Sequence, residues 1–370
     1  AYLNEEKKEN ASLALLGELD ALRIPEHAYV NPETDAAHCW GHHAQMAGIF
    51  GAALALTVPE IAEKLGGQVV FFATPAEEYG EIEFKNQLRE QGKIRYGGGK
   101  CELIRTGAFD DIDLCLAHHI QQGDEIQVGS GTGNGFVSKV IRYLGKAAHA
   151  AGAPDKGVNA LSAASLGLQA LGLNRETFRD EDCVRVHPII TKGGNLVNVI
   201  PDEIVIETLV RAKTIEAFTD AAKKTDRSFQ AGAVAMGAKV EITTLPGYLP
   251  TLAEQALPEL KRAAELAAPE VPVREAAGHS GGSTDVGDVQ HLMPVYTFNT
   301  GGVKGGLHQI NFEVTNEEEA YIDTAKMFAL AAYGLLKEKA ARSKELVKNY
   351  KPVFKDSAEY TKFMEQFDSK

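Results

Sequence analysis

The chain has 370 residues, of which 44% are hydrophobic and 24% are charged, and it carries a formal net charge of −13. This composition is that of an ordinary globular protein, so it excludes a disordered, collagen-like or low-complexity chain. No stretch reaches the ~18–20 apolar residues of a membrane span, so no membrane partner is expected. The acidic balance also argues against nucleic-acid binding, which needs clustered Lys and Arg.

The cysteines and the start of the chain bear on its cellular setting. Cys39, Cys101, Cys115 and Cys183 are too few and too scattered for a disulfide framework or a structural zinc site, so a reducing cytoplasm is expected. The N-terminal stretch is acidic and polar, unlike a signal peptide. Because the first residue is Ala1 rather than Met, we expect a processed N-terminus or a start inside a longer gene product.

The first third of the chain alternates strands with helices. Strands rich in apolar residues are predicted over 13–19, 68–73 and 112–120, with a buried helix from about residue 41 to residue 56. This alternation predicts an α/β fold with a mostly parallel sheet. Functional groups in such sheets gather just beyond the carboxyl ends of the strands.

The middle of the chain follows a different pattern. Strands are predicted over 136–145, 183–191, 203–212 and 238–246, with helices over 158–171 and 214–236. The order β-α-β-β-α-β is that of a ferredoxin-like unit, whose strands are antiparallel and whose helices share one face. We therefore expect an α+β domain inserted over 134–246.

The remainder returns to the first pattern. Predicted there are a helix over 252–267, a strand over 294–300 and a long helix over 316–340. These segments complete a discontinuous main domain made of residues 1–133 and 247–343. Residues 344–370 are expected to form an appended amphipathic helix.

Four segments rich in histidine and acid offer metal ligands. They are His38-Cys39-Trp40-Gly41-His42-His43, Glu77-Glu78, His118-His119 and His308. Histidine, cysteine and carboxylate bind zinc and its neighbours, and a further carboxylate can act as a base on water. Each segment also has an ordinary interpretation as surface or packing residues. The acid pair and the histidine pair follow two expected core strands, which favours a shared metal site.

The local motifs resemble a metal-dependent amidohydrolase family. The matching stretches are ALLGELDALRIP, AHCWGHHAQMAGIFGAA, TPAEE, GAFDDIDLCLAHHI, GKAAHAAGAPDKGVNAL, GGNLVNVIPD, GSTDVGDV and GGLHQINF, in that order over residues 13–335. The family includes aminoacylases, hippurate hydrolases, auxin-conjugate hydrolases and aminobenzoyl-glutamate hydrolases. YGGGKCELIRTGAF is most similar to the aminobenzoyl-glutamate and dipeptide-hydrolysing branch. The resemblance implies a catalytic domain of zinc-exopeptidase type with an inserted lid or dimerisation domain.

The resemblance also implies the roles of the site residues. It places ligands for one or two Zn or Mn ions at His42, Glu78, His119 and His308, and a general base at Glu77. Such metals lower the pKa of water towards ~7 and polarise the amide carbonyl, while the free carboxylate carries the proton to the leaving amine.

One position departs from the family pattern. Relatives usually carry a metal-bridging cysteine two residues before the ligand histidine, where this chain has Trp40. Because Trp cannot ligate a metal, either Cys39 binds through a bulge, or the site holds one ion, or the metal is lost. His118 and His43 are weaker ligand candidates, expected behind the ligands or on the surface. Asp20 is expected to orient a ligand histidine.

The expected inserted domain supplies a second set of residues. By the resemblance, His149 reaches the active site of the other subunit and donates a hydrogen bond to the developing oxyanion. Asn198 and Arg211 match residues that bind the free carboxylate of the substrate. Structural roles for all three, in turns or surface ion pairs, stay open. The glycine-rich segments lack the spacing of phosphate loops and are expected to be turns.

The sequence therefore predicts a dimeric metal-dependent amidohydrolase acting on N-acyl amino acids, aminobenzoyl-glutamate-like conjugates or small dipeptides. A metal-deficient binding protein with the same fold and a carboxypeptidase for longer peptides are the alternatives. Relatives carry several dozen residues before the strand at 13–19, including a helix and a strand of the sheet. We therefore expect a fragment whose catalytic domain lacks its N-terminal portion.

Overall fold

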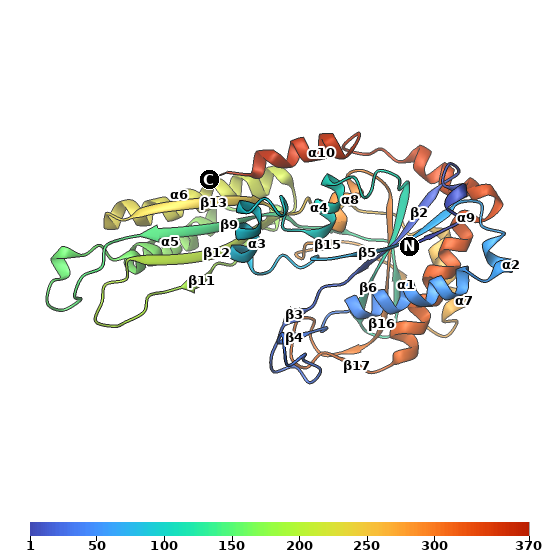
Figure 1. Ribbon diagram of the computed structural model, residues 1–370, viewed down its shortest axis with the longest axis horizontal. Helices are drawn as coiled ribbons and strands as arrows, with labels where there is room; N and C mark the ends of the chain where they lie inside the picture. The colour runs from blue at the N-terminus through green and yellow to red at the C-terminus, as the bar shows by residue number, and fades with distance from the viewer. Residues whose placement is uncertain (370) are drawn as a thin grey trace.

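A computed structural model describes residues 1–369 and shows two large β-sheets arranged end to end along the long axis of the molecule (Figure 1), besides two small two-stranded sheets. The larger sheet belongs to the first and last parts of the chain, and the smaller sheet belongs to the middle. This arrangement confirms the predicted α/β fold with an inserted ferredoxin-like α+β unit.

The larger sheet has a parallel centre and antiparallel additions. Its order is β1 (Tyr2–Leu3), β5 (Gln68–Thr74), β2 (Ser12–Glu18), β6 (Leu114–Gln122), β16 (Val295–Lys304), β7 (Ile126–Val128) and β14 (Val273–Glu275), with β17 (Glu313–Val314) also on β16. Strands β5, β2, β6 and β16 run parallel to their neighbours in this centre, whereas β1, β7 and β17 pair antiparallel. Every residue of β2 is buried, as expected of a strand covered on both faces.

Helices cover both faces of this sheet. Leu13 and Leu15 face a cluster that contains Phe328 of α9 (Thr324–Asn349), which packs with α1 (His42–Leu56) and α7 (Pro258–Ala267). Ala14 and Leu16 point the other way, into a cluster shared with α4 (Gly99–Arg105) and α8 (Val286–Gln290). The alternation of side chains along β2 therefore serves two cores.

The smaller sheet is antiparallel. Its order is β10 (Arg185–Val186), β12 (Glu203–Ala212), β9 (Gly135–Leu144) and β13 (Lys239–Pro246), with β11 (Ile189–Lys192) also on β12. The helices α5 (Ala160–Asn174) and α6 (Ile215–Met236) pack against each other and on the sheet. The strand predicted over 183–191 is divided into β10 and β11 around Pro188, which has no backbone N–H to give to a ladder.

Several elements differ from the predictions. The helix predicted over 252–267 starts only at Pro258, because proline favours the first helical position. The long helix predicted over 316–340 begins with a π-helical segment over Glu318–Asp323. It continues as α9 to Asn349, and residues 337–340 within it have non-helical backbone angles. The shorter elements α2 (Pro59–Ala62), α3 (Ile82–Glu90), β3 (Leu22–Arg23), β4 (Ala36–Ala37), β8 (Thr132–Gly133) and β15 (His279–Ser280) complete the fold.

The C-terminal segment runs along both halves of the molecule (Figure 1). Its helix α10 (Ser357–Met364) packs on α4 beside the larger sheet. Farther on, Ser369 exchanges two backbone hydrogen bonds with Thr244 of β13, at 2.8 and 3.1 Å. The segment thereby connects the two halves. Within residues 1–369, no helix combines the length and the apolar character that crossing a membrane requires.

Candidate active site

The carboxyl ends of β2, β5 and β6 border a cavity of about 600 Å³. The acidic and basic side chains that line it include Glu18, Glu77, Glu78, His119, Arg211 and His308. They come from segments as far apart as residues 18 and 308. The cavity therefore lies where a parallel sheet places its functional groups.

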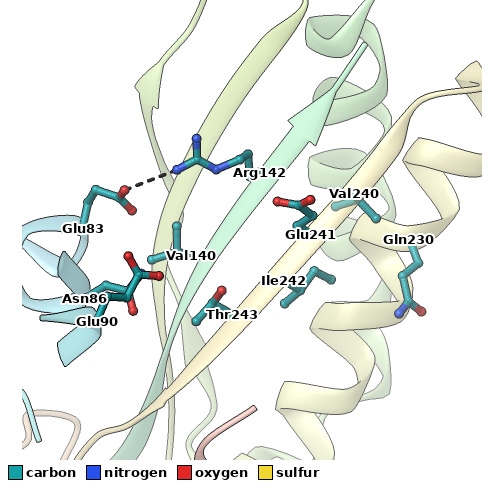
Figure 2. A pocket seen from close by; sticks show the side chains of 10 residues that line it. All are labelled: Glu83, Asn86, Glu90, Val140, Arg142, Gln230, Val240, Glu241, Ile242 and Thr243. Atoms are coloured by element: carbon teal, nitrogen blue, oxygen red, sulfur yellow. Dashed lines mark hydrogen bonds and ion pairs between the residues drawn. The ribbon is translucent and has the colours of Figure 1, made fainter. Parts of the chain in front are cut away.

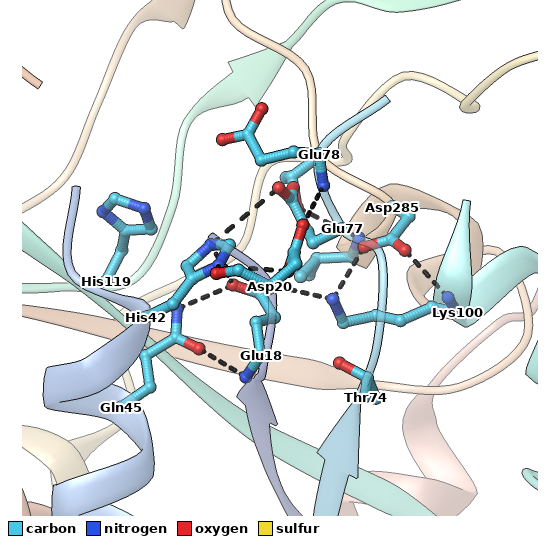
Figure 3. A network of polar contacts seen from close by, with 12 residues as sticks. Glu18, Asp20, His42, Gln45, Thr74, Glu77, Glu78, Lys100, His119 and Asp285 are labelled. Carbon is cyan, nitrogen blue, oxygen red and sulfur yellow. Dashed lines mark hydrogen bonds and ion pairs between the residues drawn. The ribbon is translucent and has the colours of Figure 1, made fainter. Parts of the chain in front are cut away.

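His42, at the start of α1, is held from both sides of its ring (Figure 3). Its Nε2 lies 2.9 Å from Glu18 Oε2, and its Nδ1 lies 3.2 Å from Asp20 Oδ1. The side chain is only 1% exposed. Burial by itself lowers the pKa of His42, but the hydrogen bonds to Asp20 and Glu18 outweigh it and raise the pKa to about 10.

Behind His42 lies a buried lysine between two carboxylates. The Lys100 ammonium, which is 0% exposed, lies 2.5 Å from Glu18 Oε1 and 2.6 Å from Asp285 Oδ1 (Figure 3). The backbone N–H of Lys100 donates a further hydrogen bond to Asp285 Oδ2 at 2.8 Å. Burial raises the pKa of Glu18, but Lys100 and His42 together hold it well below its usual range.

Every oxygen of the Glu18 carboxylate has a partner. Oε1 accepts from Lys100, while Oε2 faces His42 and also accepts from Gln45 Nε2 at 2.8 Å. Gln45 in turn accepts from the Glu18 backbone N–H at 2.9 Å. Glu18 is therefore a fully hydrogen-bonded support for His42.

The glycine-rich segment before Lys100, which was expected to be a turn, leads into α4 and packs closely against the chain after β5. A Cβ on Gly99 would lie 1.6 Å from the backbone oxygen of Pro75, at the end of β5. The absence of a side chain at Gly99 therefore allows α4 to start against β5. This close approach places Lys100 next to Glu18.

The two glutamates after β5 contact different histidines: Glu78 contacts His308, and Glu77 lies near His42. Glu78 Oε1 lies 3.0 Å from His308 Nε2, and the Glu78 backbone N–H donates to Asp20 Oδ2 at 2.7 Å. Glu77 is buried, and its Oε2 lies 3.9 Å from His42 Nε2. Burial, together with the charge of Glu18, raises the pKa of Glu77 well above its usual range. Glu18, His42 and Glu77 each offer a ligand atom within 4.8 Å of the other two.

Trp40 packs between two of the predicted ligands. Its ring lies 5.0 Å from that of His42 and 5.2 Å from that of His308, edge-on in both cases. Trp40 and Cys39 belong to a small apolar cluster with Ala44, and neither residue lines the cavity. Burial and the charge of Glu78 raise the pKa of Cys39 to about 11, so its thiol keeps its proton near neutral pH.

The other histidines differ in what their rings contact. His119 lines the cavity, with Nδ1 2.8 Å from the Ile120 backbone oxygen and its ring 6.1 Å from that of His42. The neighbouring His118 also borders the cavity, but its Nε2 lies 2.8 Å from Thr300 Oγ1, and burial holds its pKa well below the usual range. His43 packs edge-on against aromatic rings, and burial lowers its pKa to about 4.

The three site residues predicted in the smaller domain fall into two groups. Arg211, near the end of β12, lines the cavity, and its buried Nε has no hydrogen-bond partner within residues 1–369. Its guanidinium carbon lies 5.8 Å from the centre of the Phe136 ring. His149 and Asn198 lie in exposed loops, where the Ala150 N–H donates to the Asn198 backbone oxygen at 2.9 Å. The chain does not bring these two residues to its own cavity.

Sequence reasoning missed Glu18, Lys100 and Asp285. Glu18 stands two residues before Asp20 in GELDAL, Lys100 ends the YGGGK run, and Asp285 lies inside GSTDVGDV. All three are therefore in motifs that carried the family resemblance. Their mutual contact was not visible, because charged residues in separate loops give no periodic signal.

The sequence profile of peptidase family M20/M25/M40 matches residues 14–333. The chain belongs to this family. It is a hydrolase of the metallo-amidohydrolase and peptidase class, which confirms the predicted family and enzyme class.

Two curated relatives and one solved structure illustrate the match to this family. The Xaa-Arg dipeptidase of Mus musculus is 28% identical over 334 residues, which cover 87% of this chain and 70% of the relative. A p-aminobenzoyl-glutamate hydrolase chain of Escherichia coli K12 is 29% identical over 208 residues, 54% of this chain and 39% of the relative. A Bacillus subtilis structure, described as a dinuclear metal binding peptidase from the M20 family, is 23% identical with a TM-score of 0.58, over 88% of this chain and 82% of its own. That structure is similar in fold.

Replacement of Lys100 should expose the energetic role of the buried cluster. The change Lys100→Met is expected to lower the free energy of unfolding by about 3–5 kcal/mol, because it leaves Glu18 and Asp285 buried without their counter-charge. Urea denaturation measures the change. The exposed residue Lys64 provides the control, since Lys64→Met should stay within about 0.5 kcal/mol of the parent. Equal effects of the two changes would contradict this interpretation.

Proposed function

We propose that the chain is a divalent-metal-dependent amidohydrolase that cleaves dipeptides or N-acyl amino acids. One observation carries the proposal. The ends of β2, β5 and β6 bring carboxylates and imidazoles together around a single cavity, and Arg211, whose buried Nε has no hydrogen-bond partner within residues 1–369, lines the same cavity. The names of relatives in the same family, an Xaa-Arg dipeptidase and an aminobenzoyl-glutamate hydrolase, support this substrate class.

The donor set suits one or two ions of Zn or Mn. Glu78 and His308 lie 3.0 Å apart at the cavity, and His119 has its Nδ1 beside a backbone oxygen, which leaves Nε2 for a metal. His42 would complete the ligand set if its Nε2, which now faces Glu18, turned to a metal, and Asp20 would still face its Nδ1. Cys39 stays outside the ligand set that we propose, because its thiol packs in an apolar cluster.

The surrounding residues divide the remaining chemistry. A bound metal polarises the amide carbonyl and lowers the pKa of water. Glu77, buried beside His42, takes a proton from the attacking water and delivers it to the leaving nitrogen. Arg211 presents a guanidinium with an unused donor to the free carboxylate of the substrate.

We further propose that two chains share their sites. His149 and Asn198 are exposed and lie outside the cavity lining of their own chain, which supports a role in the cavity of a partner. In a two-fold dimer each smaller domain then serves the other chain. There His149 donates a hydrogen bond to the developing oxyanion, and Asn198 binds the substrate carboxylate.

The change Glu77→Gln tests the base. It is expected to lower kcat by roughly 10²–10⁴-fold, because the amide does not accept the proton, while metal content stays at the parent level. Steady-state kinetics on N-acyl amino acids and dipeptides, paired with elemental analysis, measure both quantities. Glu63→Gln at an exposed position is the control.

The same measurements separate the competing functions. A protein without bound Zn or Mn and without hydrolysis would support the non-catalytic binding protein instead. Product analysis on a series of peptides of increasing length tests the third possibility. Release of single C-terminal residues from long peptides, with no cleavage of dipeptides, would indicate a carboxypeptidase.

The change Arg211→Met tests recognition of the substrate carboxylate. It is expected to raise KM by roughly 10–100-fold with a smaller effect on kcat, because a charge-assisted hydrogen bond is lost. Arg185→Met is the matched control, since Arg185 pairs with Arg211 in the adjacent strand but is exposed. An amidated substrate, which lacks the carboxylate, should be insensitive to Arg211→Met; a KM change of the same size there would refute the role.

Subunit mixing tests the shared site. Glu77→Gln and His149→Ala should each be inactive alone. After the two are unfolded and refolded together, about a quarter of the parent activity should return, because half of the dimers are mixed and each mixed dimer has one complete site. No recovery, with dimers confirmed by light scattering, would show that His149 does not act in the partner's site.

A further inference from the structure

A second cavity, of about 620 Å³, lies at the joint between the two halves of the molecule (Figure 2). One wall is α3, which contributes Glu83, Asn86 and Glu90. The opposite wall is formed by residues of β9 and β13 in the smaller sheet. The helix of the larger half that borders this cavity is thus the one that follows the Glu77-Glu78 pair along the chain. The residues that line it are distinct from those that line the candidate active site.

Two buried acceptors on α3 have no donor among the residues that the structure describes. The Asn86 side chain lines the cavity, the residue is only 7% exposed, and its Oδ1 is one of these acceptors. Glu83 Oε2, one helical turn earlier, is the other. A buried acceptor without a donor costs about 1–3 kcal/mol, so a site of this kind calls for a group that brings N–H or O–H donors.

The charges of the lining select the sign of that group. Glu83 and Glu241 contribute carboxylates, and Arg142 is the only cation among the described lining residues. The Arg142 guanidinium is already engaged, with Nη2 3.3 Å from Glu83 Oε1 and Nη1 bonded to Glu203. A donor that enters the cavity therefore meets an excess of negative charge, which favours an ammonium group.

The rest of the lining suits a short aliphatic chain. Val140 shares the face of the sheet that carries Arg142 and Glu241, and it offers apolar contact between the polar groups, while Val240 and Ile242 border the cavity from the other face of β13 (Figure 2). An amine on a flexible methylene stem combines both properties, because its stem covers apolar surface while its head reaches the acceptors.

We propose that this cavity binds a small aliphatic ammonium compound, of the class of linear diamines and free basic amino acids. The ammonium donates to Asn86 Oδ1 and Glu83 Oε2, and Glu241 adds charge from the opposite wall. The site is also connected to the first cavity, because Lys85 of the same helix donates to the Glu78 backbone oxygen at 2.7 Å. The binding itself does not depend on the proposed hydrolysis.

Calorimetric titration of the metal-loaded protein with putrescine and with L-lysine tests the proposal. Saturable binding with a Kd of about 1 mM or tighter is expected for at least putrescine. Asn86→Leu and Glu241→Gln should each weaken binding at least about tenfold. The matched control Glu216→Gln, an exposed acid on α6, should leave the Kd unchanged. Arg211→Met should also leave it unchanged, which separates this cavity from the active site.

Asn86→Leu also has a readout without ligand. If Asn86 is a binding residue, its replacement by an apolar side chain of similar size should leave stability equal to or above that of the parent, because an unsatisfied acceptor is removed. No saturable binding by the parent protein would mean that water alone fills the cavity and would overturn the proposal. Unchanged amine binding by a folded Asn86→Leu, or preferential binding of the anion glutarate, would overturn it as well.

Discussion

A lysine with no access to solvent holds together the segments of the candidate active site. The Lys100 ammonium lies between Glu18 at the end of β2 and Asp285 just before α8, so three segments are held by one charge. A buried charge is tolerated only when it is paired and hydrogen-bonded, and here the partner carboxylates are themselves held by Gln45 and by the Lys100 backbone. Because Glu18 in turn holds His42, the position of the imidazole depends on Lys100.

Much of the fold was accessible from the sequence because it is encoded in periodic apolar patterns. The strand β2 and the helices α5 and α6 were predicted close to their observed ranges, since each buries a continuous or regularly spaced apolar set. The short strands β7 and β14 were not predicted, because three residues are too few to show a periodic pattern. The predicted start of α7 was too early, because the apolar residues before Pro258 have a helix-like spacing.

The site was predictable to the extent that strand ends mark it. The pair Glu77-Glu78 and the residue His119 do line one cavity, as the rule for parallel sheets implies. Alternation along β6 then directs the His118 ring to Thr300, which the sequence alone did not decide. The sequence identified Trp40 as standing where relatives have a metal-bridging cysteine, and its contacts show an indole packed edge-on against His42 and His308. Contacts across long separations, such as that of Lys100 with Asp285, are set by tertiary structure only.

The pairing of Ser369 with Thr244 has a consequence for the behaviour of the molecule in concentrated solution. Strand β13 lies at the edge of the smaller sheet, where unpaired backbone N–H and C=O groups offer a template to another chain. The C-terminal segment occupies part of that edge with two backbone hydrogen bonds. Besides joining the halves of the molecule, the segment therefore covers backbone groups of β13 that could otherwise pair with a strand of a neighbouring molecule.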